Sequence, residues 1–141
     1  MAGPARFFLR NTTRDLTDEQ AGLRTTKSEL CLGGLIKHVA RVERRWVTFI
    51  LEGLNAMTFS EDDYAAYANQ FKMLPGETLA GVLAELPSLD ADHPLPEAPW
   101  FEPGARWSAR RVFMHIIAET AQHSGHADII RESLDGAKSM G

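Results

Sequence analysis

Apolar residues recur at the three- and four-residue spacing of helices in three segments of the chain, and no segment alternates convincingly as a strand would. The three segments are residues 28–52, 77–86 and 108–134. Ser28 and Ser108 stand at the starts of two of them as candidate N-caps, and Gly53 directly follows residue 52 as a stop signal. The pattern predicts three major helices, the second of which ends early because Pro87 follows it.

Weaker helical signals precede and separate these segments. Residues 5–14 carry a short apolar cluster, Thr17 and Gln20 have the spacing of a capping box, and Ser60 is a candidate N-cap for a short helix over residues 60–70. Most of the prolines fall in residues 88–103, which predicts an extended loop with an exposed His93, long enough to lie over the mouth of a site. Together the elements predict an all-α single domain over residues 1–141, arranged as an antiparallel four-helix bundle.

Side chains of the segment 28–52 divide into an inward and an outward face. The inward stripe includes Leu35, Val42 and Phe49 and is interrupted by His38, so His38 is expected to point toward the core. The opposite face carries basic residues that are expected to be solvated, namely Lys37, Arg41, Arg44 and Arg45. Glu43 is expected at the surface, with support of a buried histidine as the alternative.

Three aromatic residues share one face of the short helix expected over residues 60–70. They are Tyr64, Tyr67 and Phe71. Packing in the core is one interpretation, and the wall of a ligand pocket is the other.

Composition narrows the function further. A net charge of -4 provides no basic face, so nucleic acid is not expected as a partner. No apolar run approaches the ~20 residues that span a bilayer, and the first ten residues do not resemble a secretion signal, so no membrane association is expected. The single cysteine, Cys31, allows no internal disulfide, which fits a cytoplasmic location.

The candidate chemistry lies in the segment 108–134. His115, Glu119, His123 and His126 fall within about 80° of arc when the segment is read as a helix. With His38 on a facing helix, two imidazoles and a carboxylate would form a three-ligand metal site that keeps positions open for substrate. Zinc suits this set, and nickel, manganese or iron are also compatible. The alternatives are that the polar side chains satisfy one another internally or that Glu119 and His123 form a surface contact.

Two stretches also resemble a known family. Residues 32–46, with the sequence LGGLIKHVARVERRW, and the pattern His115-x-x-x-Glu119-x-x-x-His123-x-Gly-His126-Ala-Asp-Ile-Ile-Arg-Glu resemble the DinB-like superfamily. Within it the chain is most similar to the mini-circle protein branch, which is related to mycothiol-dependent S-transferases. The resemblance covers nearly the whole chain.

The resemblance implies a four-helix bundle in which His38, Glu119 and His123 hold a divalent metal. It also implies a transferase in which the metal activates a low-molecular-weight thiol, mycothiol or similar, for attack on a small electrophile. From the residues alone, His115 and His126 are candidates to add a ligand, to orient one by hydrogen bonding or to handle protons near the substrate. Cys31 matches no functional position of the family.

The chain departs from the family pattern in its first and third helices, which are both expected to be shortened. The bundle must then cover its core in another way, by forming a homodimer, by exchanging elements between chains or by folding the loop across it. The shortening also leaves a second functional interpretation, a helical bundle that binds a metal or small ligand without catalysing a reaction.

Overall fold

The computed structural model describes residues 3–85 and 92–138, and within them it contains six α-helices and one short 3-10 helix. The elements are α1 (Gly3–Asn11), α2 (Asp18–Gly22), α3 (Leu32–Glu52), η1 (Leu54–Met57), α4 (Glu61–Ala68), α5 (Leu79–Ala84) and α6 (Ala109–Asp135). The only β-type pairing in these residues is an isolated bridge between Pro94 and Ser108. The predicted all-α bundle is therefore confirmed, although its exact four-helix arrangement stays a prediction.

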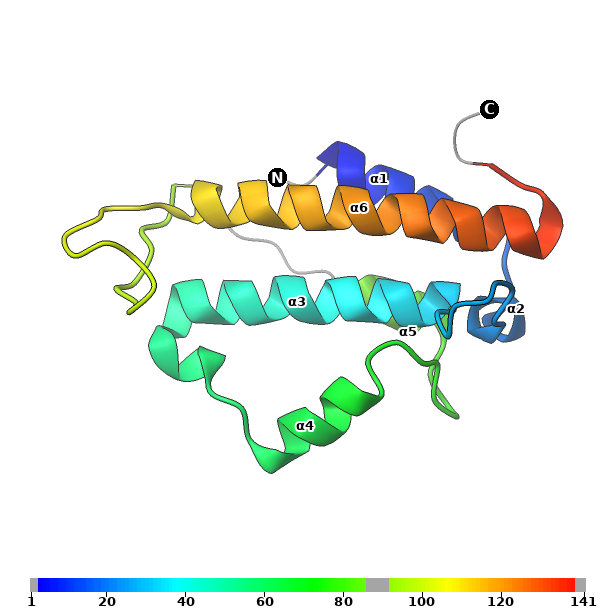
Figure 1. The fold of residues 1–141 in the computed structure, drawn as a ribbon, viewed down its shortest axis with the longest axis horizontal. Coiled ribbons are helices and arrows are strands. Elements are labelled where there is room, and N and C mark those ends of the chain that lie inside the picture. Colours follow the sequence, from blue (N-terminus) through cyan, green and yellow to red (C-terminus); the bar gives the residue numbers. More distant parts are fainter. Residues whose placement is uncertain (1–2, 86–91, 139–141) are drawn as a thin grey trace.

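Two long helices form the centre of the fold. Figure 1 shows α3 and α6 side by side and running in opposite directions, with α4 set apart from α3 on the side away from α6. α1 packs on α6, whereas α2, α5 and η1 pack on α3. The expected short first and third helices correspond to α1, with 9 residues, and α5, with 6.

Local capping explains where several helices begin and end. Thr17 with Gln20 forms the predicted capping box of α2, and Ser60 caps α4 in a second capping box with Asp63. The predicted start of α3 at Ser28 is wrong, because Cys31 is its N-cap and accepts a hydrogen bond from the backbone N–H of Gly34 on its sulfur. Cys31 is buried there and has a structural role.

The apolar core has two parts, one toward each end of the α3–α6 pair. The first joins α1, α3, α5 and α6 and contains Leu9, Leu35, Ile36, Val82 and Ile130 among others. The second contains Phe49, Ile50, Ala109, Val112, Phe113 and Ile116. The middle of the helix pair, between the two apolar clusters, is the part that carries polar side chains.

The segment after residue 91 folds across the second cluster. Leu95, Ala98 and Phe101 pack against it, so covering of the core by the loop is the alternative that the structure supports. The expected exposure of His93 is wrong, because the residue is half-buried and its carbonyl accepts a 2.7 Å hydrogen bond from the N–H of Ala109. Residues 88–91 of the predicted loop lie outside the described residues. Dimerisation stays a prediction.

No helix in the described part of the chain combines the length and the apolar character needed to cross a membrane. The longest helix, α6, carries charged residues along its length.

Candidate functional site

His38, Glu119 and His123 come together in the polar middle of the α3–α6 pair. The rings of His38 and His123 meet edge to face with their centroids 5.0 Å apart. His123 Nε2 lies 3.8 Å from Glu119 Oε2, one helical turn away on α6. All three residues line a cavity of about 10 Å³ between the helices, which has room for about one water molecule or ion. The structure therefore brings these three residues of α3 and α6 to one cavity.

The three side chains surround the cavity without converging on a single point. Within residues 3–85 and 92–138, no three His, Cys, Asp or Glu side chains are already close enough to form a ready set of metal ligands. Glu119 has the most accessible side chain of the three, 41% exposed against 16% for His123. Its carboxylate is thus the member of the set with the most freedom to move.

His38 is held in one orientation by a residue at the end of α4. Its Nδ1 lies 2.8 Å from Gln70 Oε1, and its ring is stacked at a tilt against Phe71 with a centroid distance of 4.4 Å. Because a carbonyl oxygen can only accept, this contact assigns the proton to Nδ1 and leaves the lone pair on Nε2. A histidine whose second nitrogen is fixed in this way is the usual form of a metal-binding histidine.

His123 is kept neutral by its surroundings. Burial lowers its pKa below the usual value, the proximity of His38 lowers it further, and Glu119 opposes the shift by favouring the charged form. Its Nδ1 atom is buried and has no hydrogen-bond partner. An unpaired buried ring nitrogen costs stability unless a further group binds there, so this atom is a candidate partner for a bound group.

Glu43 corrects an expectation from the sequence. It is not at the surface but 1% exposed, and it lines the same cavity as His38 and His123. Its carboxylate forms an ion pair with Arg6 of α1 and accepts a 3.4 Å hydrogen bond from the hydroxyl of Thr120. The Arg6–Glu43 pair therefore ties α1 to the wall of this cavity, and the alternative of support for a buried histidine stays a prediction.

The two remaining candidate histidines lie on the exposed side of α6. The ring of His126 is 5.7 Å from that of His123, so His126 is next to the site. His115 is about 12 Å away along the helix axis from His123 and packs edgewise on Trp46 instead. With Trp100 and Phe101, His115 lines a separate cavity of about 420 Å³ near the second apolar cluster.

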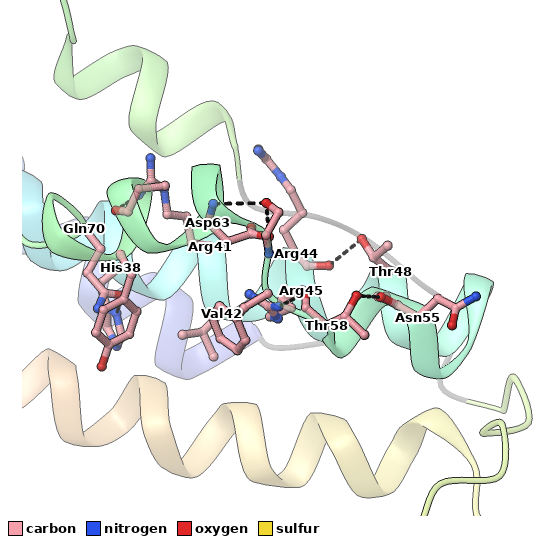
Figure 2. Close-up of a pocket in the computed structure, with 15 residues that line it drawn as sticks. His38, Arg41, Val42, Arg44, Arg45, Thr48, Asn55, Thr58, Asp63 and Gln70 are labelled. Carbon is pink, nitrogen blue, oxygen red and sulfur yellow. Dashed lines mark hydrogen bonds between the residues drawn. The ribbon is translucent and has the colours of Figure 1, made fainter.

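A larger cavity of about 610 Å³ opens directly beside His38, and we call it the arginine pocket. It lies between α3 and the segment 55–70, as shown in Figure 2. Its lining includes His38, Arg41, Arg44, Arg45, Asp63, Tyr67 and Gln70. His38 lines both cavities, so its side chain borders the arginine pocket and the site between the two long helices.

The basic face of α3 departs from expectation in two ways. Arg41 and Arg45 are half-buried along this cavity, whereas Arg44 is exposed, so the basic face of α3 is only partly solvated. Lys37 is 2% exposed and pairs with Glu77 at 2.7 Å.

The three aromatic residues of the segment after Ser60 differ in whether they lie at the surface or against the core. Tyr64 and Tyr67 are exposed, so the core interpretation is wrong for them, and Tyr67 is a wall of the arginine pocket. Phe71 packs against the first apolar cluster, as the core interpretation expects.

Comparison with known proteins adds the family. The family model described as mycothiol S-transferase matches residues 3–136. The chain belongs to the mycothiol S-transferase family. This agrees with the DinB-like resemblance that residues 32–46 and the pattern from His115 indicate. No curated protein and no solved structure matches the chain.

Gln70 is the site residue that sequence reasoning missed. It is a single neutral amide just beyond the last helical residue of α4, and nothing in the local pattern distinguishes it from a solvated glutamine. The one available signal was its position next to Phe71, which shares the predicted inward face.

Proposed function

We propose that the protein is a metal-dependent thiol S-transferase in which His38, Glu119 and His123 hold one divalent metal ion. The observation that carries the proposal is the pair of imidazoles that face each other between α3 and α6, one with its Nδ1 fixed by Gln70 and the other with a buried Nδ1 lacking a partner. The mycothiol S-transferase family supports a low-molecular-weight thiol as one substrate. When bound, the ion would lower the pKa of that thiol and so increase the thiolate population near neutral pH.

The protein's own residues would orient the donors and move the proton. Gln70 fixes the ring of His38, and burial keeps His123 in the neutral form that can donate a lone pair. His126, exposed beside His123, is suited to accept the thiol proton on a ring nitrogen. The sulfur then forms a bond to the electrophilic atom of the second substrate, and the leaving group departs with the electrons of the broken bond.

Zinc is the proposed metal because a set of two imidazoles and one carboxylate suits it, with nickel, manganese and iron as alternatives. Glu119 contributes a negative charge to the set, which strengthens binding of a cation. Glu43 adds a second carboxylate to the wall of the cavity, but the guanidinium of Arg6 balances its charge. Glu119 therefore supplies the carboxylate near the two histidines whose charge is not balanced by Arg6.

The experiment that tests this proposal measures thiol consumption with mycothiol and a panel of electrophiles. Wild-type protein loaded with zinc should catalyse the transfer, and His38→Ala and His123→Ala should each abolish it while the helical circular dichroism spectrum is kept. His93→Ala is the matched control, because His93 lies on the loop segment away from the site and should retain the wild-type rate. Equal turnover in all four proteins would contradict the proposal. Retention of metal without any thiol-dependent turnover would favour a non-catalytic metal-binding bundle.

A further inference from the structure

The arginine pocket is a second cavity beside the histidine site, and it is large enough for a ligand of its own. It has a volume of about 610 Å³, against about 10 Å³ for the cavity between the histidines, so it can admit a small organic molecule. Figure 2 shows Gln70 and His38 at one end of the row of lining side chains and Asn55 at the other, with the arginines between them. A molecule in this pocket would therefore reach the site with one end.

Arg45 provides the strongest indication of what the pocket binds. Its guanidinium lies 3.7 Å above the ring of Phe59, and one Nη donates a 2.8 Å hydrogen bond to the carbonyl of Thr58. Its Nε atom is buried and has no hydrogen-bond partner. A buried donor on a cation is costly to leave unpaired, and an anionic oxygen is the acceptor that pairs with it most strongly.

The charges around the pocket favour an anion as well. Arg41 lies on the same wall one helical turn before Arg45, is half-buried, and donates to the carbonyl of Ala66 at 2.6 Å. Asp63 is the acidic residue of the lining, but it is engaged in the helix cap of α4. The backbone N–H and the hydroxyl of Ser60 both donate to Asp63 at 2.8 Å, and these bonds hold its pKa below the usual range.

Arg44 differs from the other two arginines. It is exposed at the rim and forms an ion pair with Glu85 at 3.2 Å. The lining therefore keeps the two positive charges of Arg41 and Arg45 against the one negative charge of Asp63, in a protein whose net charge is -4. A positive cavity in an acidic protein selects for anionic small molecules from solution.

We propose that the arginine pocket binds a substrate through a carboxylate, which Arg41 and Arg45 hold while the rest of the molecule extends toward His38. The proposal rests on the proposed function for its assignment as a substrate site, because the pocket opens on His38. The carboxylate can belong either to the thiol or to the electrophile. Phe59 and Tyr67 line the same cavity, so a carboxylate attached to a flat apolar group fits it best.

The test measures binding and needs no turnover. N-acetylphenylalanine is titrated into the full-length protein by calorimetry and compared with its carboxamide, which has the same shape without the charge. N-acetylcysteine and its carboxamide form a second pair that reports a carboxylate on the thiol. We expect the carboxylate of at least one pair to bind about tenfold or more tightly than its amide. The pair with the larger ratio identifies the source of the carboxylate.

Substitutions then locate the binding site. Arg45→Gln and Arg41→Gln should each remove most of the preference for the carboxylate, and Arg45→Lys should keep part of it because the charge remains. Arg110→Gln is the matched control, since Arg110 is an exposed arginine paired with Asp92 outside the pocket. The Nε–H resonance of Arg45 in the unmodified protein should also shift when the carboxylate binds, a readout that does not depend on any variant folding.

The proposal is overturned if carboxylates and amides bind equally or not at all, or if the Arg45 Nε–H resonance stays unchanged at saturation. It is also overturned if Arg110→Gln weakens binding as much as Arg45→Gln does. Failure of the proposed function would appear differently, as loss of thiol turnover in a protein that still distinguishes the carboxylate from the amide.

Discussion

Gln70 Oε1 lies 2.8 Å from His38 Nδ1 and joins the end of α4 to the middle of α3. The contact crosses 32 residues of sequence and determines which ring nitrogen of His38 carries the proton. Gln70 lines the arginine pocket, and His38 lines both that pocket and the cavity between α3 and α6. The arginine pocket and the histidine site are thus linked through this hydrogen bond.

Replacement of Gln70 should weaken metal binding. Gln70→Leu removes the acceptor for His38 Nδ1, so the ring loses its fixed orientation, and loss of such support typically costs about 10- to 100-fold in metal affinity. Gln70→Glu keeps an acceptor and should retain the affinity. Competition with a chromogenic zinc chelator measures both, and Gln122→Leu on the exposed side of α6 is the control. Unchanged affinity in Gln70→Leu would show that this contact does not support the site.

Gly34 should tolerate no side chain, because α3 passes directly beneath the chain that follows α4. A Cβ at Gly34 would lie 2.0 Å from the backbone oxygen of Phe71, so the segment carrying Gln70 and Phe71 would have to move. Gly34→Ala should therefore lower the free energy of unfolding by about 3 kcal/mol. Gly125→Ala is the opposite control, since a Cβ there meets nothing within 4 Å, and it should stabilise α6 by about 0.5–1 kcal/mol. Urea unfolding measures both, and destabilisation of equal size at the two positions would contradict this packing.

The Lys37–Glu77 pair should make stability depend on acid pH. Desolvation alone would raise the pKa of Glu77, but hydrogen bonds from the N–H of Leu74 and from Lys37 outweigh it and place the pKa below the usual 4.5. A carboxyl whose pKa is lowered by folding stabilises the protein at pH values above the pKa that it has in the unfolded chain. This contribution is lost as the pH falls through the pKa that the carboxyl has in the folded protein. Glu77→Gln leaves Lys37 buried without its anion and should cost about 1–3 kcal/mol at pH 7.

Urea unfolding of wild type and Glu77→Gln at a series of pH values checks this expectation. The difference between the two proteins should be constant near neutral pH and should decrease below about pH 4.5, where the Glu77 carboxyl of the unfolded chain takes up a proton while that of the folded protein is still charged. A difference that does not change with pH would show that the charge of Glu77 contributes nothing to stability.

The sequence predicted the parts of this molecule that depend on local spacing. The capping residues Thr17 and Ser60 begin their helices as expected, and Gly136 ends α6 in the left-handed conformation just beyond the predicted limit. His38 and His123 were placed on facing helices from periodicity and from the family resemblance, and their rings do meet. These features follow from contacts within a few turns or from the single pairing of two long helices.

The errors at Glu43 and Lys37 have a common cause, which is that charged residues on helices were interpreted as solvated. Glu43 and Lys37 are both buried, and each is balanced by a partner 37 or 40 residues away, Arg6 for Glu43 and Glu77 for Lys37. A buried charge requires such a partner, and sequence spacing does not reveal one at that distance. The late start of α3 has a different cause, because the thiol of Cys31 caps the helix where a hydroxyl at Ser28 was expected.

The metal content of the protein tests the central claim most directly. Elemental analysis by mass spectrometry would be made on protein purified without a metal affinity column, alongside His38→Ala, Glu119→Ala and the control His93→Ala. The account predicts about one equivalent of a divalent transition metal in the wild type and in His93→Ala, and loss of that metal in the other two variants. No metal in the wild type after incubation with zinc and removal of the excess, or equal metal in all four proteins, would contradict it.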